Sequence, residues 1–241
     1  MELRNKTVVF LGDSITEGVG TSSPEKSYVS IFQKLSGAKV INYGISGTRI
    51  AKNRSPSACP EWDQDFISRV DKMQRNADVI VVFGGTNDFG HGDSGIGDFE
   101  SKSEYTFYGA LHILCSRLIE KYPYAEIVFV TPLHRISENN PINEIGRKTP
   151  LLSKYVAAIQ QVASYYGFPV LDLFHTSGLQ PKVEIIQKLY MPDGLHPSDK
   201  GAERIAHSFL EHTSIIKGEN RDDENNSGIG RCRLHRQPHR I

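Results

Sequence analysis

The 241-residue chain has little that would stabilise a fold covalently or through a metal, and little that would attract a polyanion. Its three cysteines, Cys59, Cys115 and Cys232, are far apart and form no C-x-x-C pair, so neither a disulfide framework nor a zinc site is indicated. Lysine plus arginine number 28, as do aspartate plus glutamate, and the formal net charge is zero. No overall field therefore favours nucleic acid or an anionic membrane, and a small-molecule substrate is expected instead.

Long hydrophobic runs are also missing. No segment approaches the roughly 18 apolar residues that a membrane span needs. Residues 1–6 leave no room for the apolar part of a signal peptide before the first predicted strand, so a cytoplasmic location is expected. Nothing in the sequence indicates an oligomeric state.

Short apolar runs are present, and their pattern predicts the fold. Each run is continuously hydrophobic rather than alternating, which is typical of parallel strands covered on both faces. The predicted strands are residues 7–11, 39–43, 79–83, 126–131 and 169–172. Apolar residues at helical spacing predict helices over residues 107–122, 152–166 and 202–210. Strands that alternate with helices predict an α/β chain, a three-layer α/β/α sandwich around a five-stranded parallel sheet.

One domain is expected over residues 1–216. From residue 217 the composition shifts to an acidic cluster and then a basic one with few apolar residues, which predicts a disordered tail over residues 217–241. Two polar stretches, residues 48–63 and 89–104, follow predicted strands and fit neither helix nor strand. They are expected as loops at the ligand-binding edge of the sheet.

A serine stands where the first predicted strand ends. The segment GDSIT, residues 12–16, follows the strand directly and begins with a glycine that allows a sharp turn. Ligands of open parallel sheets bind at this edge, and Ser14 there is a candidate nucleophile if a base reaches it. The neighbouring Asp13 is expected to bond local backbone and fix the turn.

The candidate base lies near the other end of the chain. Asp193 and His196 stand three residues apart, just ahead of the last predicted helix. A carboxylate can hold an imidazole in the tautomer that accepts a proton from a serine. Pro197 disfavours helical geometry at His196 and suits the first turn of the helix that follows.

Donors for a developing oxyanion are expected after the second and third strands. Gly44 and Gly47 lie in the segment NYGISGT, residues 42–48, and either glycine could expose its amide to a ligand. Asn87 lies in GGTND, residues 84–88, and its side chain is a neutral donor. Asp88 beside it is expected to anchor a loop.

These segments together resemble the SGNH, or GDSL-type, hydrolases. The chain has GDSIT near its start, Gly47 after the second strand, GTND after the third and Asp-x-x-His near its end, in the order of that family's four blocks. The resemblance implies a flavodoxin-like sheet of strand order 2-1-3-4-5 and serine ester hydrolysis without a cofactor or metal. It implies that Ser14 is the nucleophile, His196 the base and Asp193 its orienting acid.

The resemblance also implies an oxyanion hole of the Ser14 and Gly47 amides and the Asn87 side chain. Family members place the donor glycine several residues beyond the strand-end asparagine, which favours Gly47. This chain departs from the usual residues after that glycine, so Gly44 stays an alternative.

The expected function is hydrolysis of short-chain acyl or O-acetyl esters, such as acetylated carbohydrates. Polar loops and balanced charge favour such substrates, and no broad apolar lid helix is predicted. One alternative is a lysophospholipase or thioesterase type of acylhydrolase, and another is a flavodoxin-like module that binds phosphate or a nucleotide. The G-x-S-x-G motif of the α/β-hydrolase fold is missing from the sequence.

Overall fold

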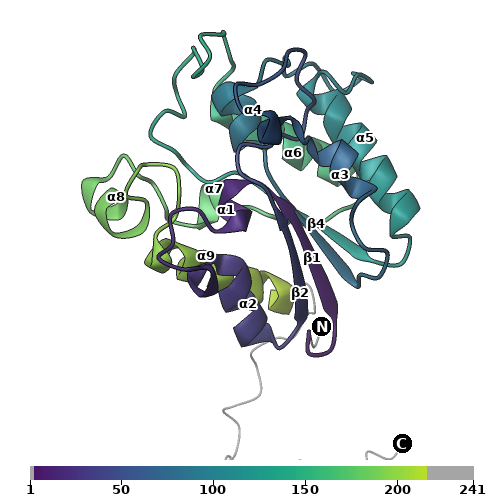
Figure 1. Ribbon diagram of the computed structural model, residues 1–241, viewed down its shortest axis with the longest axis vertical. Helices are drawn as coiled ribbons and strands as arrows, with labels where there is room; N and C mark the ends of the chain where they lie inside the picture. Colours follow the sequence, from purple (N-terminus) through teal and green to yellow (C-terminus); the bar gives the residue numbers. More distant parts are fainter. Residues whose placement is uncertain (1–2, 216–241) are drawn as a thin grey trace, which may run out of the picture.

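Five parallel strands form the central sheet of the computed structural model, which describes residues 3–215 (Figure 1). Their order is β2-β1-β3-β4-β5, as the resemblance implied. The strands are β1 (Thr7–Gly12), β2 (Lys39–Gly44), β3 (Val79–Phe83), β4 (Glu126–Val130) and β5 (Val170–Leu171). The predicted tail, residues 217–241, and Cys232 within it lie outside the described residues.

Helices cover the sheet on both faces and complete the predicted α/β/α sandwich. The α-helices are α1 (Ser14–Glu17), α2 (Tyr28–Ser36), α3 (Phe66–Val70), α4 (Thr86–His91), α5 (Phe107–Lys121), α6 (Leu152–Tyr166), α7 (Leu173–Thr176), α8 (Glu184–Tyr190) and α9 (Asp199–Ile215). Figure 1 shows α2 and α9 together on one side of the sheet, and α3, α5 and α6 on the other. Among residues 3–215, no helix is both long and apolar enough to span a membrane.

Alternate strand residues pack into two separate hydrophobic cores, one on each face of the sheet, which explains the continuous apolar runs. In β1, Val9 and Leu11 pack with α3, α5 and α6, while Val8 and Phe10 pack with α2 and α9. Phe10 meets the rings of Tyr28, Phe32 and Phe209 edge to face at 5.5–5.7 Å. Because both faces are covered, a strand here has no polar side.

The structure departs from the predicted elements in a few places. β2 is half exposed, because as an edge strand it pairs only with β1. A short helix, α4, takes up the start of the predicted loop 89–104, with every residue of the helix buried. β5 has only two residues, and the last helix is longer at both ends than predicted.

This topology brings the predicted site segments to one edge. The carboxyl ends of β2, β1 and β3 are neighbours, since the three strands are parallel and adjacent. The segments that follow them hold Gly47, Ser14 and Asn87, in that spatial order. Loops and helix starts therefore converge where the sequence predicts the ligand.

Candidate functional site

Ser14 lies on a tight turn between β1 and α1. It is the first residue of α1, and Asp13 caps the helix by accepting a hydrogen bond from the Ile15 amide at 3.0 Å. A side chain at Gly12 would meet Thr16 Oγ1 at 2.0 Å, so only glycine fits at the strand exit. Burial raises the pKa of Asp13 to about 7, against the Ile15 hydrogen bond and the Arg69 charge.

A hydrogen-bonded chain joins Ser14 to the loop before α9. Ser14 Oγ lies 2.9 Å from His196 Nε2, and His196 Nδ1 lies 2.7 Å from Asp193 Oδ2. Because Nδ1 faces a carboxylate, that nitrogen carries the ring proton and Nε2 accepts from the serine hydroxyl. The structure thus brings together three predicted residues from opposite ends of the chain.

Backbone hydrogen bonds hold the acid in place. Asp193 Oδ1 accepts from the amides of Leu195 at 2.9 Å and His196 at 2.7 Å, which leaves Oδ2 for the imidazole. Partial burial acts to raise the pKa of Asp193, but the hydrogen bonds from His196 and Leu195 lower it below its ordinary value. Asp193 is therefore an ionised acceptor at neutral pH.

A loop from the N-terminal part of the chain keeps His196 close to Ser14. A side chain at Gly20 would meet the Pro197 carbonyl oxygen at 2.6 Å and His196 Cβ at 2.9 Å, so the two backbones are in close contact. The amide and hydroxyl of Ser22 each donate to the Asp199 carboxylate at 2.7 Å. These contacts fix the loop after α1 against the start of α9.

The chain has a second Asp-x-x-His pair with nearly the same local geometry. Asp172 Oδ2 lies 2.7 Å from His175 Nδ1, and Asp172 also accepts from the His175 amide. The His175 side chain is 60% exposed, against 18% for His196, and no serine hydroxyl within residues 3–215 bonds its ring. Contact with Ser14 therefore distinguishes the two pairs.

Candidate amide donors follow the strands on either side of β1. The Gly44 amide is already used, because it donates to Asn42 Oδ1 at 2.7 Å. The amides of Ser14 and Gly47 have no hydrogen-bond partner in the described part of the chain, and Gly47 has a φ of +72° that favours glycine. Asn87 Nδ2 donates to the Thr48 carbonyl at 3.0 Å, which leaves its second N–H for another acceptor.

Two buried charged residues, Asp88 and Arg69, hold these loops. The Asp88 carboxylate accepts from the amides of Ile50 at 3.0 Å and Ala51 at 2.8 Å, as expected of a loop anchor. Arg69, in α3, was not predicted. Its guanidinium donates to the carbonyls of Gly12 and Tyr43, at 2.9 and 2.8 Å, and to a third acceptor, Thr48 Oγ1, at 3.1 Å.

Arg69 thereby ties the ends of β1 and β2 to the loop that holds Gly47. Its partners are mostly backbone atoms, which no side-chain motif would reveal. Burial lowers the pKa of Arg69 to about 10, so it keeps its charge at neutral pH.

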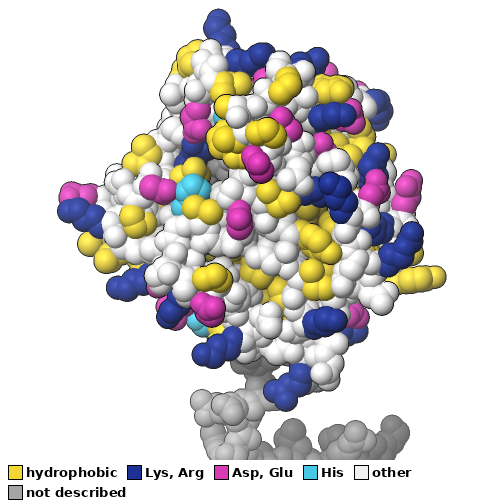
Figure 2. Space-filling view, in the orientation of Figure 1, with side chains coloured by type: hydrophobic (Ala, Val, Ile, Leu, Met, Phe, Trp, Pro, Cys, Tyr) yellow, Lys and Arg dark blue, Asp and Glu magenta, His cyan; other side chains and the backbone are white. Residues whose placement is uncertain are grey.

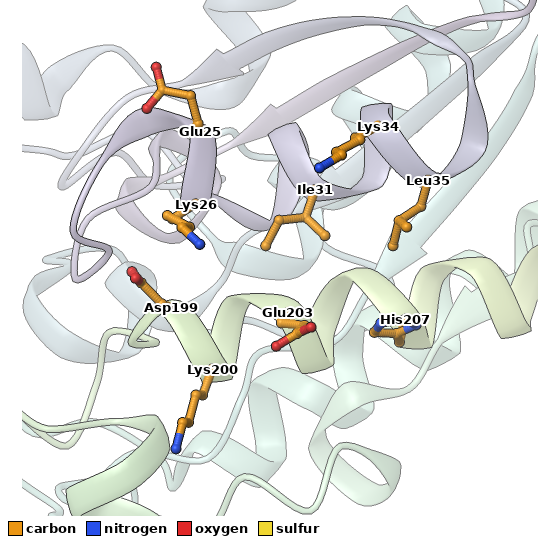
Figure 3. Close-up of a pocket in the computed structure, with 9 residues that line it drawn as sticks. All are labelled: Glu25, Lys26, Ile31, Lys34, Leu35, Asp199, Lys200, Glu203 and His207. Carbon is orange, nitrogen blue, oxygen red and sulfur yellow. The ribbon is translucent and has the colours of Figure 1, made fainter.

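The surface around the site carries mixed charges. Figure 2 shows acidic, basic and hydrophobic side chains interspersed over this face, without a field of one sign. A groove of about 550 Å³ lies elsewhere, between α2 and α9, and contains none of the predicted site residues (Figure 3). Within residues 3–215, no cluster of three or more His, Cys, Asp and Glu side chains is arranged to hold a metal ion.

Comparisons with known proteins bear on the fold and the family of the chain. A similar solved structure, of a protein from Lactobacillus plantarum, is 29% identical with a TM-score of 0.73, covering 90% of this chain and 99% of that chain. A possible lipase from Chitinophaga pinensis is 23% identical, with a TM-score of 0.66 over 88% of this chain and 99% of that one. For the lipase/acylhydrolase from Enterococcus faecalis the identity is 22%, the TM-score 0.60 and the coverage 91% and 100%.

The last two likenesses concern the fold alone, and no curated protein matches the chain. The sequence model of the GDSL-like lipase/acylhydrolase family matches residues 10–204, which include every predicted site residue. The chain therefore belongs to the GDSL-like lipase/acylhydrolase family.

Proposed function

We propose that the protein is a serine ester hydrolase in which Ser14 is the nucleophile, His196 the general base and Asp193 the acid that orients it. The observation that carries the proposal is the Ser14–His196–Asp193 chain of hydrogen bonds, at 2.9 and 2.7 Å. A base that accepts from a serine hydroxyl and is oriented by a carboxylate is the arrangement that activates serine.

In the first half of the cycle, Ser14 Oγ attacks the ester carbonyl while its proton passes to His196 Nε2. The carbonyl oxygen becomes an oxyanion, which the amides of Ser14 and Gly47 and the Asn87 side chain stabilise. The bond to the alcohol then breaks, and the alcohol oxygen takes the proton from His196. The acyl group stays on Ser14.

In the second half, water attacks the acyl carbon and gives a proton to His196 Nε2. Collapse of the second tetrahedral intermediate breaks the bond to Ser14 Oγ, which recovers its proton, and the carboxylic acid leaves. The Asp193 carboxylate stabilises the imidazolium in both halves, since it accepts from Nδ1 throughout.

The substrate that we favour is a short-chain acyl or O-acetyl ester, such as an acetylated carbohydrate. The interspersed acidic and basic side chains of the face in Figure 2, without a field of one sign, support an uncharged substrate. One observation favours a longer acyl chain and hence the lysophospholipase or thioesterase alternative. Val19 and Ile136, beside Gly20 and Gly194 in the loops that hold His196, are 40% and 47% exposed. A phosphate- or nucleotide-binding module would not require the contact between Ser14 and His196.

A panel of esters tests the proposal. Hydrolysis of acetyl, butyryl and octanoyl p-nitrophenyl esters, of an acetylated glycoside and of an acyl thioester is measured for the wild type and for Ser14→Ala. Ser116→Ala, on the exposed side of α5, is the control. We expect Ser14→Ala to lose activity on every substrate while Ser116→Ala keeps it. Activity in Ser14→Ala equal to that of the wild type would contradict the proposal.

A further inference from the structure

An aromatic side chain and a histidine lie directly beside the proposed oxyanion donors. Trp62, in a 3-10 turn (Pro60–Asp63), covers Gly47: a side chain there would fall 2.3 Å from the indole. The ring centroids of Trp62 and His91 are 4.8 Å apart. His91 follows Asn87 by four residues in α4, so both lie on one face of that helix.

The hydrogen bond between His91 and Arg49 determines which ring nitrogen of His91 carries the proton. Arg49 Nη1 lies 2.9 Å from His91 Nδ1. A guanidinium only donates, so Nδ1 is the acceptor and the proton of the neutral ring is on Nε2. Burial, followed by the charges of Arg49 and Arg135, lowers the pKa of His91 to about 4, which keeps the ring neutral near pH 7.

The Nε2–H group of His91 has no partner among residues 3–215, although the residue is only 9% exposed. The nitrogens that are both buried and unpaired in the described part of the chain are Arg49 Nε, Arg69 Nε and His212 Nε2, so His91 Nε2 stays open to solvent and to a ligand. A bound ligand can therefore replace water as the acceptor of this N–H. The neutral imidazole brings no charge of its own, so its N–H can donate to an uncharged hydroxyl or ring oxygen without a charged ligand to balance it.

Arg49 holds both rings of this pair. The guanidinium is fully buried, and its Nη2 donates to the Trp62 carbonyl at 3.1 Å, to Ser57 Oγ at 3.0 Å and to Asp63 Oδ1 at 2.9 Å. The buried Arg49 thus holds the backbone of Trp62, and it also determines which nitrogen of the His91 ring carries the proton. Such support makes a binding surface rigid before the ligand arrives.

We propose that Trp62 and His91 form a substrate subsite that binds the sugar of an acetylated carbohydrate. The indole packs on the apolar face of the sugar ring, and His91 Nε2–H donates to a hydroxyl or ring oxygen next to the reacting ester. The subsite lies beside Gly47 and Asn87, which places the recognised oxygen near the carbonyl that reacts. This inference rests on the proposed function, because the subsite serves the ester that Ser14 attacks.

Two substrates that transfer the same acetyl group test the subsite. One is a mono-O-acetylated methyl glycoside with free hydroxyls, and the other is p-nitrophenyl acetate. The quantity of interest is the ratio of their kcat/KM values. In His91→Phe, which keeps a ring but lacks the donor, we expect this ratio to fall roughly five- to tenfold, as for the loss of one hydrogen bond to an uncharged group.

Two further variants separate recognition from general damage. His91→Gln retains an N–H donor, so its ratio of kcat/KM values is expected to lie between those of His91→Phe and the wild type. His112→Phe removes another buried histidine, one whose two nitrogens already bond Tyr166 and Phe99, and is expected to leave the ratio unchanged.

Equal losses on both substrates in His91→Phe, an unchanged ratio, or a wild type inactive on the glycoside would each overturn the subsite. These outcomes differ from failure of the proposed function, in which Ser14→Ala would hydrolyse both substrates like the wild type.

Discussion

Replacing Asp193 with asparagine removes one charge and leaves the rest of the turn in place. Asparagine Oδ1 can still accept from the amides of Leu195 and His196, which now bond Asp193 Oδ1 at 2.9 and 2.7 Å. The group that faces His196 Nδ1 becomes an NH2, and two donors then meet where the native distance is 2.7 Å. The imidazole relieves this by moving its proton to Nε2, and it can no longer accept from Ser14.

The expected result is a fall in kcat of about 10³- to 10⁴-fold, equivalent to about 4–5.5 kcal/mol of activation free energy. The free energy of unfolding should change by less than about 1 kcal/mol, because the Asp193 carboxylate is more than half exposed. The assay is hydrolysis of p-nitrophenyl acetate, with urea unfolding as a check on the fold.

Asp172→Asn is the matched control, since the Asp172 carboxylate holds His175 at the same 2.7 Å but bonds no predicted site residue. We expect its activity to stay within about twofold of the wild type. More than a tenth of the wild-type activity in Asp193→Asn, or an equal loss in Asp172→Asn, would contradict the role assigned to Asp193.

Three other perturbations test parts of the site. Asn87→Ala should lower kcat by about 10²- to 10³-fold, because one oxyanion donor is lost, and lower stability by only about 1 kcal/mol for the bond to the Thr48 carbonyl; unchanged turnover would remove Asn87 from the mechanism. Asp13→Asn tests the pH dependence of stability. The pKa of Asp13 in the folded protein is raised from 3.8 to about 7, so the folded protein binds more protons than the unfolded chain between about pH 4 and 7. The wild type therefore loses stability as the pH rises through this range. Urea unfolding at pH 4.5 and 8 should show a smaller loss in Asp13→Asn than in the wild type, and equal losses would contradict this assignment. Arg69→Met should lower the free energy of unfolding by about 1–3 kcal/mol, since the Tyr43 carbonyl loses this donor while the Gly12 carbonyl keeps only the Ile45 amide; thermal and urea unfolding check this, and wild-type stability in the variant would contradict it.

Much of the fold follows from burial on both faces of the sheet. β1 and β3 were predicted almost residue for residue, because each is apolar along its length and feeds two cores. α4 was missed because its sequence, TNDFGH, has glycine and polar residues that favour a loop. Its helical form depends on burial against the loops around it, such as the Asp88 bonds to Ile50 and Ala51, and local propensity does not contain that information.

In the candidate site, the positions that could be predicted from sequence are those whose side chains bond one another. Ser14 and His196 are 182 residues apart, yet the strand exit and the Asp-x-x-His spacing pointed to both. The same spacing at Asp172 and His175 shows that the motif alone does not identify a site. Arg69 could not be found from sequence, because it binds backbone oxygens that only the folded chain brings together.

The central claim is that the Ser14 hydroxyl, activated by His196, attacks an electrophilic centre. Reaction with a fluorophosphonate measures this directly, because phosphorus bonds to Ser14 Oγ as fluoride leaves and the proton passes to His196. Intact-protein and peptide mass spectrometry should find one adduct, on Ser14, absent from Ser14→Ala and formed far more slowly in His196→Ala. An adduct on another residue, or labelling of His196→Ala at the wild-type rate, would contradict the account.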